Sequence, residues 1–167
     1  MPTTPRMPTH ARRPMAALGA ALIASLTLTL VPALSAPASA VTMTLAMRET
    51  RAFSIAKAHV GAPYRYGASG PSAFDCSGLT HYSLVGAGFG AVPRTAAAQA
   101  QRARHIARRY LRPGDLIFFY NGSGIYHVAY FVRWVNGKAE ILHAPYPGAR
   151  VRYEMIWTNS WFPATLR

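Results

Sequence analysis

Cysteine and acidic residues are scarce in this sequence: its 167 residues include one cysteine and five Asp or Glu. A single cysteine cannot form an internal disulfide, so packing must stabilise the fold. Against the five acidic residues stand 18 Lys and Arg, which give a formal charge of +13 at pH 7. Such an excess attracts polyanions over long distances. No nucleic-acid-binding motif accompanies it, and we therefore expect no nucleic-acid partner.

Long apolar runs are also rare, and the one at residues 16–30 is only 15 residues long. Its flanks are Arg6, Arg12 and Arg13 before it and Ala38-Ser39-Ala40 after it. This pattern is typical of an export signal peptide, and the run is short for a bilayer span of about 20 residues. We expect residues 1–40 to be removed, leaving no stable membrane association. An uncleaved anchor is the alternative, and Arg12-Arg13 leaves open whether export is Sec or twin-arginine.

Removing residues 1–40 leaves 127 residues, enough for one domain with one core. That domain keeps 15 basic and five acidic residues, a formal charge of +10. For an exported protein, the expected counterpart is an anionic cell wall and its polymers. The densest basic run, residues 102–109, is either a solvated helix face or a binding patch. We expect the domain to be a monomer.

The order of the predicted elements indicates an α+β fold, with N-terminal helices packed on a central antiparallel sheet. Residues 41–48 lack a pattern and are expected to be a short mobile segment before a single folded domain, residues 49–167. Helices are predicted over 49–60, from Cys76 to about Val85, and over 96–103. Strands are predicted over 116–120, 127–134, 139–144 and 150–153, the first of them buried on both faces.

Cys76 follows the turn-rich segment 61–72 and opens a predicted helix. In the first turn of a helix, free backbone N–H groups and the helix dipole stabilise an anion. The pattern therefore predicts a thiol pKa below the ordinary value of about 8.5. The alternative is that Cys76 is a small buried hydrophobic residue, the commoner role of a free cysteine. Its polar and glycine-rich neighbours, Asp75, Ser77 and Gly78, favour a nucleophile.

A cysteine nucleophile needs a base within hydrogen-bond reach and a third group that orients the base. Five histidines follow residue 40. His59 lies near a predicted helix end, His81 lies five positions after Cys76 and off its helix face, and His105 lies among arginines. His127 and His143 remain, on two strands of a predicted hairpin. Each, taken alone, is equally well explained as a structural histidine of the sheet.

The hairpin turn decides whether His127 and His143 can meet. A two-residue turn at Asn136-Gly137 puts them on opposite sides of the sheet. A three-residue loop, with Gly137 as a bulge, places His143 opposite Ala129, on the side of His127. The catalytic hypothesis therefore predicts the three-residue loop, unless another bulge shifts the register.

Six motifs follow one another along the chain: Gly61-x-Pro63-Tyr64-x-Tyr66-Gly67, Phe74-Asp75-Cys76-Ser77-Gly78-Leu79, Val92-Pro93-Arg94-Thr95, Arg112-Pro113-Gly114-Asp115-Leu116-Ile117-Phe118-Phe119, His127-Val128-Ala129 and Leu142-His143-Ala144. Together, and in this order, they resemble the NlpC/P60 cysteine peptidases of bacterial cell walls. The resemblance spans about residues 50–160. It implies a compact papain-like fold, in which the nucleophile heads a helix packed on an antiparallel sheet.

The resemblance also implies roles for individual residues. Cys76 would be the nucleophile, His127 the general base, and His143 the residue that orients His127. Tyr64 would help the backbone N–H of Cys76 hold the oxyanion. Asp75 and Ser77 would contact the free amino end of the peptide stem. No cofactor is implied, and one cysteine with two strand histidines is a poor zinc set.

The function implied by the resemblance is that of an exported endopeptidase acting on peptidoglycan stem peptides. Its expected target is the bond between the side-chain carboxyl of D-glutamate and the diamino acid, cut through a thioester intermediate. A related Cys-His amidase or acyltransferase remains an alternative. So do a cell-wall-binding module without turnover and an effector directed at a neighbour's wall.

Overall fold

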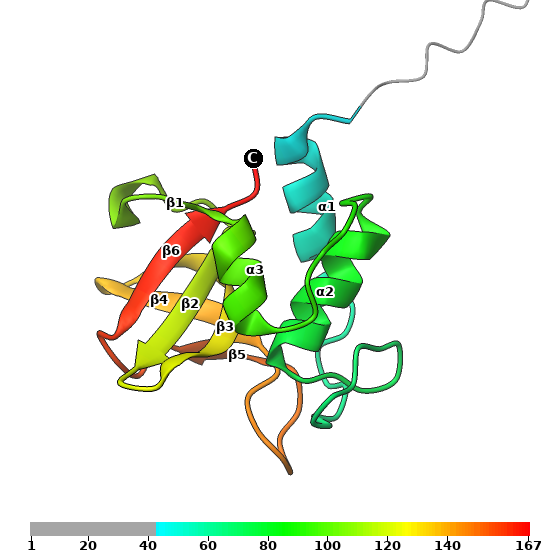
Figure 1. Ribbon diagram of the computed structural model, residues 1–167. Coiled ribbons are helices and arrows are strands. Elements are labelled where there is room, and N and C mark those ends of the chain that lie inside the picture. Colours follow the sequence, from blue (N-terminus) through cyan, green and yellow to red (C-terminus); the bar gives the residue numbers. More distant parts are fainter. Residues whose placement is uncertain (1–42) are drawn as a thin grey trace, which may run out of the picture. The chain divides into compact units, whose positions relative to one another are not determined.

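The computed structural model of the chain describes residues 43–167, so the expected signal peptide lies outside the described residues. Three helices come first and an antiparallel sheet of six strands follows, which confirms the predicted α+β class (Figure 1). The elements are α1 (Leu45–Lys57), α2 (Cys76–Gly86), α3 (Ala96–Arg102), β1 (Arg104–His105), the 3-10 helix η1 (Arg108–Tyr110), β2 (Leu116–Asn121), β3 (Gly124–Val135), β4 (Lys138–His143), β5 (Arg152–Met155) and β6 (Trp161–Thr165). The strand order is β1-β6-β2-β3-β4-β5.

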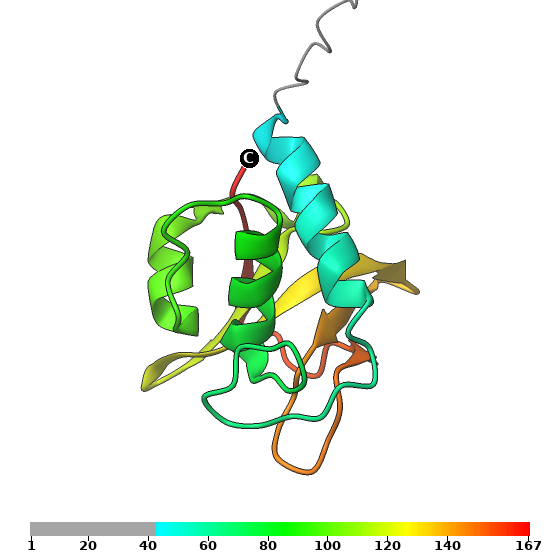
Figure 2. The same cartoon turned by 90° about the vertical axis from the view of Figure 1, so that its right-hand side faces the viewer.

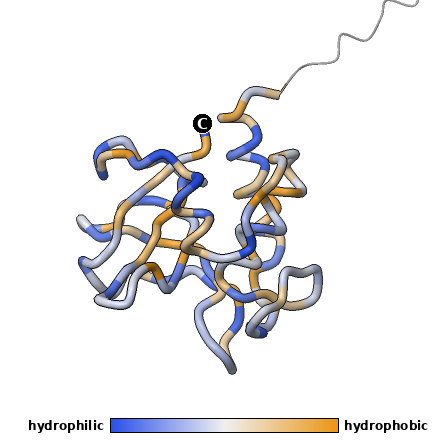
Figure 3. Tube along the Cα trace, in the orientation of Figure 1, coloured by the Kyte–Doolittle hydropathy of each residue, from blue (hydrophilic) through white to orange (hydrophobic). Residues whose placement is uncertain are grey.

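The helices cover one face of the sheet, as two perpendicular views show (Figure 1, Figure 2). α2 and α3 pack against β3, and α1 packs against α2. The main core between helices and sheet includes Leu116 and Phe118 of β2, whereas Ile117 and Phe119 belong to a second cluster on the opposite face. β2 is therefore buried on both faces, as its unbroken apolar sequence predicts. Apolar segments accordingly run through the centre of the trace (Figure 3).

α1 begins earlier than the sequence pattern predicts. The helix starts at Leu45, so residues 45–48 are helical and do not belong to a mobile segment. The Thr44 side chain caps it by accepting a hydrogen bond from the Met47 N–H. Leu45 and Met47 are exposed, so the apolar residues of this first turn do not follow the pattern of a helix with one buried face. The start of the helix could therefore not be recognised from hydrophobic periodicity. Among residues 43–167, no helix combines the length and apolar character needed to cross a bilayer.

The strands beyond residue 150 differ most from the predictions. β5 begins two residues later than the predicted strand 150–153. β6 lies between β1 and β2 inside the sheet, yet it was not predicted. Its central residue, Pro163, has no N–H to donate, and proline inside a short apolar run argues against a strand. The Pro163 carbonyl still accepts a hydrogen bond from the Ile106 N–H.

The turn between β3 and β4 corrects the predicted three-residue loop. Val135 pairs with Lys138, so Asn136 and Gly137 form a two-residue turn. Their φ angles of 49° and 77° are those of the turns that follow the twist of a hairpin. Further along, however, Arg133 pairs with Glu140 and Phe131 with Ile141, which leaves Val132 as an extra residue in β3. This bulge supplies the register shift that was expected at the turn.

We expect Gly78→Ala to destabilise the protein by roughly 1–3 kcal/mol. Gly78 lies in α2, and a Cβ atom there would overlap the carbonyl oxygen of Ala68 in the preceding loop. Urea unfolding measures the change. Gly90→Ala is the matched control, because its Cβ would meet no atom within 4 Å. Equal stability of the two variants would contradict this account of the loop contact.

Candidate active site

Cys76 is the first residue of α2, as predicted, and Asp75 is its N-cap. The Asp75 carboxylate accepts a hydrogen bond of 2.6 Å from the Gly78 N–H. It thereby satisfies one of the free donors in the first turn, which is the usual role of aspartate at this position. The thiol of Cys76 is partly buried and unpaired with any other cysteine.

Asp75 also connects the helix to two other segments. Its carboxylate forms an ion pair of 2.6 Å with Arg94 and accepts a hydrogen bond from the Gly67 N–H. Arg94 further donates to the hydroxyl of Ser77 and to the carbonyl of Ala68. Asp75 is only 6% exposed, so its carboxylate is largely engaged within the protein. Its observed role is therefore to hold the loop, α2 and Arg94 together.

His127 on β3 and His143 on β4 meet as the catalytic hypothesis requires. Nε2 of His127 lies 2.8 Å from Nδ1 of His143, and both side chains are buried. The bulge at Val132 makes this contact possible, because it brings His143 into register on the side of His127. On its other side, Nε2 of His143 lies 3.0 Å from the Glu154 carboxylate.

A second bulge lies beside His127. Phe119 of β2 pairs with His127, but Tyr120 pairs with Ile125, so Tyr126 is an extra residue of β3. Bulges of this kind redirect the neighbouring side chains and are frequent next to active sites. Tyr126 thus lines the cavity next to His127 although the two residues are adjacent in one strand.

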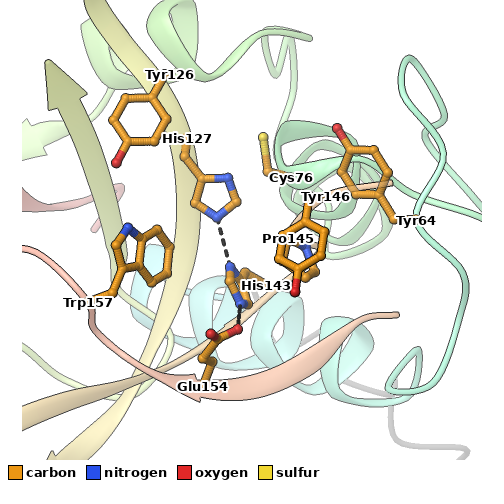
Figure 4. Close-up of a pocket in the computed structure, with 9 residues that line it drawn as sticks. All are labelled: Tyr64, Cys76, Tyr126, His127, His143, Pro145, Tyr146, Glu154 and Trp157. Carbon is orange, nitrogen blue, oxygen red and sulfur yellow. Dashed lines mark hydrogen bonds and ion pairs between the residues drawn. The ribbon is translucent and has the colours of Figure 1, made fainter. Parts of the chain in front are cut away.

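Cys76, His127 and His143 line one cavity of about 410 Å³. Its remaining walls are Tyr64, Tyr126, Pro145, Tyr146, Glu154 and Trp157 (Figure 4). Nδ1 of His127 is the ring nitrogen turned toward Cys76 (Figure 4). The indole of Trp157 packs near both imidazoles and stacks on Phe119 with ring centres 4.5 Å apart. The cavity therefore has a nucleophile, an imidazole and aromatic walls.

Burial determines the charge state of the two central groups. It raises the pKa of the Cys76 thiol, although the backbone N–H of Val128 acts in the opposite direction. Burial lowers the pKa of His127 to about 3, and the nearby His143 adds to this effect. The expected lowering of the thiol pKa is thus wrong, because desolvation exceeds the stabilisation at the start of the helix. At neutral pH both groups are uncharged in the free protein.

Tyr64 and Ser77 both line a cavity that Cys76 also lines. Tyr64 borders both the cavity described above and a neighbouring one, which Asp75, Ser77 and Arg94 also line. Burial, followed by the charges of Cys76 and Asp75, raises the pKa of Tyr64, so its hydroxyl remains a donor. Ser77 is buried, and its hydroxyl contacts Arg94 and Asp75.

Several residues of the site were not assigned a role from the sequence. Arg94 belongs to one of the six motifs, but its partner Asp75 lies 19 positions away and the pairing has no local pattern. Tyr126 is the extra residue of the bulge in β3, and Trp157 lies in the segment between β5 and β6. Glu154 belongs to β5. Only the small number of acidic residues, five in the whole sequence, could have drawn attention to Glu154. Within residues 43–167, no group of three or more His, Cys, Asp or Glu is arranged to hold a metal ion.

Comparison with known proteins identifies relatives of the described domain. The profile described as "NlpC/P60 family" matches residues 61–167. The probable endopeptidase p60 of Listeria monocytogenes is 40% identical over 106 residues, which cover 64% of this chain and 20% of that protein. A probable endopeptidase of Corynebacterium glutamicum is 42% identical over 91 residues, or 53% of this chain and 39% of that protein. The chain thus spans about a fifth of the Listeria relative's length.

The fold of the described domain is also similar to those of solved structures. The P60 domain of an antigen from M. avium subspecies paratuberculosis matches with a TM-score of 0.61 and 27% identity, over 72% of this chain and 96% of that one. The peptidoglycan hydrolase RipB of Mycobacterium tuberculosis matches with a TM-score of 0.61 and 25% identity, over 73% of this chain and 66% of that one.

We expect the free energy of unfolding to fall as the pH is lowered from 7 to 5, because of His127. Its pKa is about 3 in the folded protein and about 6.5 in an unfolded chain, so the unfolded state binds the proton first. This group alone removes roughly 2 kcal/mol over that interval. Urea unfolding at each pH, in the wild type and in His127→Gln, measures the difference. Parallel pH dependences would show that His127 is not held neutral by burial.

Proposed function

Because the chain belongs to the NlpC/P60 family, we propose that it is an exported cysteine endopeptidase that hydrolyses the peptide stems of peptidoglycan. One observation carries the proposal: a single cavity contains Cys76 at the start of α2 and the hydrogen-bonded pair His127 and His143. A nucleophile, a base and a group that orients the base are the parts that acyl transfer requires. The relatives named as endopeptidases and peptidoglycan hydrolases support the substrate class.

In the proposed mechanism, Cys76 attacks the scissile carbonyl carbon while its proton passes to Nδ1 of His127. The backbone N–H of Cys76 and the hydroxyl of Tyr64 stabilise the oxyanion. The imidazolium then protonates the leaving amine, and a thioester to Cys76 remains. Water, activated by His127, hydrolyses the thioester and restores the free enzyme. Because the resting pair is neutral, the charges form only as the substrate reacts.

We further propose that the bond cut joins the D-glutamate side-chain carboxyl to the diamino acid. The proposal draws on the family resemblance and on the cavity that Asp75, Ser77 and Arg94 line beside the thiol. An amidase that cuts nearer the sugar and an acyltransferase use the same Cys-His chemistry and are the enzymatic alternatives. The non-enzymatic alternative is a module that binds the cell wall without cleaving it.

The charge distribution supports an additional contact with anionic wall polymers. Each of the five carboxylates in residues 43–167 is within 4.0 Å of a basic side chain, and these pairs use His143 and four arginines. The other 11 of the 15 Lys and Arg in this part of the chain have no carboxylate partner there. Five of them are exposed in the segment Arg102–Arg112, which includes the edge strand β1. The trace of this segment is largely hydrophilic (Figure 3). This segment is the part of the domain best suited to a polyanion.

We expect Cys76→Ala to lower the release of soluble peptides from purified peptidoglycan by more than about 1,000-fold. The wild-type protein from Val41 onward is compared with Cys76→Ala, and mass spectrometry of the fragments identifies the new termini. His127→Ala should show a comparable loss, whereas His81→Ala, on α2 but outside the cavity, is the matched control. The new termini distinguish the endopeptidase from the amidase.

The same proteins also test the alternative that the domain binds the cell wall without cleaving it. Cys76→Ala should still bind the insoluble wall, because its cavity and charge are otherwise unchanged. If neither the wild type nor Cys76→Ala releases peptides from walls of several compositions, the endopeptidase proposal fails and the binding module takes its place.

We expect binding to purified cell walls to weaken as NaCl is raised from about 0.05 to 0.5 M, because screening shortens the range of the charges. The double variant Arg109→Gln/Arg112→Gln should bind at least about threefold more weakly at low salt. Lys57→Gln/Lys138→Gln removes the same charge elsewhere and is the control. Affinity that is independent of salt, or equal losses in both double variants, would contradict a contact through the segment Arg102–Arg112.

A further inference from the structure

Glu154 lies on β5, next to the strand that carries His143. In the pairing of β4 with β5, Arg152 is opposite His143, and Glu154 is opposite Ile141. Paired residues of an antiparallel sheet point to the same face, as do residues two positions apart on one strand. Glu154 is therefore a diagonal neighbour of His143 on the face that the two histidines share.

The Glu154 carboxylate is held by two neighbours. Its Oε2 atom lies 3.0 Å from Nε2 of His143 and 2.9 Å from Nε of Arg152. The terminal Nη2 of Arg152 lies 2.7 Å from the same oxygen. Burial by itself would raise the pKa of Glu154, but the hydrogen bonds from Arg152 and His143 exceed this effect and lower it. The carboxylate is therefore ionised at neutral pH and can only accept hydrogen bonds.

This requirement determines which nitrogen of each imidazole carries the proton. His143 must donate from Nε2 to the carboxylate, and burial keeps the ring neutral, so its Nδ1 has no proton. Nδ1 of His143 consequently accepts, and Nε2 of His127 must be the donor across the 2.8 Å contact. A neutral His127 with its proton on Nε2 has a free lone pair on Nδ1, the nitrogen turned toward Cys76 (Figure 4).

We propose that Glu154 is a positioning residue, which fixes the tautomers of His143 and His127 through two successive hydrogen bonds and so leaves Nδ1 of His127 ready to take the thiol proton. The catalytic consequence rests on the proposed function, whereas the tautomers are a property of the resting protein. During attack, the S–H bond of Cys76 breaks and an N–H bond forms at Nδ1 of His127. The charge of Glu154 then stabilises the imidazolium through His143, and no proton needs to reach the carboxylate.

The tautomers can be measured directly in the wild-type protein by 15N NMR of the histidine rings, assigned with His127→Gln and His143→Gln. We expect both histidines to carry the proton on Nε2 at pH 7. A proton on Nδ1 of His127 would overturn the proposal, whatever the activity of the protein. Conversely, the expected tautomers in a protein that cannot hydrolyse peptidoglycan would contradict the proposed function alone.

Two variants distinguish the contribution of Glu154 as a hydrogen-bond acceptor from the contribution of its negative charge. Glu154→Gln keeps an oxygen that can accept from His143, so it should preserve the tautomers and lower kcat about 10-fold. Glu154→Leu removes the acceptor, so signals of protonated Nδ1 should appear for His143 and His127, and kcat should fall about 100-fold. In both variants KM should remain unchanged, because Glu154 acts through His143.

The matched control is Glu140→Gln, which removes a carboxylate that pairs with Arg133 at 2.7 Å on the neighbouring strand. It should leave kcat and the histidine spectra unchanged. Thermal unfolding checks that each variant is folded, and if Glu154→Leu is not, the wild-type spectrum and Glu154→Gln still decide. A folded Glu154→Leu with wild-type spectra and kcat would overturn the proposal. A raised KM with unchanged kcat would also overturn it, because it would place Glu154 in contact with the substrate.

Discussion

The hydrogen bond between His127 and His143 is the interaction on which the geometry of the site depends. It requires two strands to present their histidines on one face, and the two-residue turn at Asn136-Gly137 alone would not do so. The bulge at Val132 corrects the register, and the resulting distance is 2.8 Å. Phe119 and Trp157 pack against His127 and contribute to its burial. The same packing that aligns the imidazoles therefore also keeps them neutral.

The five carboxylates of the domain show how a strongly basic chain uses its few acidic residues. Asp75 caps α2 and holds Arg94, and Glu154 contacts His143. Glu49 and Asp115 both pair with Arg167, which fastens the end of β6 to α1 and β2. Glu140 pairs with Arg133 across β3 and β4. These five carboxylates pair with only four of the 15 Lys and Arg in residues 43–167, so the other basic side chains of this part of the chain keep their positive charge without a carboxylate partner there. Two of the five, Asp75 and Glu154, lie near the thiol.

The sequence predicts the parts of the structure that depend on local patterns. The helix that begins at Cys76 and the doubly buried strand β2 are confirmed, because capping and apolar runs are readable along the chain. β6 was missed, since Pro163 obscures a strand that only its neighbours stabilise. The bulge at Val132 and the contact of Glu154 with His143 depend on pairing between strands, which has no local signal. The thiol pKa was predicted in the wrong direction because burial is a property of the whole fold.

Burial keeps Cys76 and His127 as a neutral pair in the free protein, and the single cysteine allows a direct test of this charge state. The rate of alkylation of Cys76 by iodoacetamide, measured from about pH 4 to 10, follows the thiolate population. We expect a negligible rate at acidic and neutral pH and a rise only above the ordinary thiol pKa of about 8.5. A rate that is already high and constant at acidic pH would reveal a thiolate–imidazolium pair in the free protein and would contradict the account.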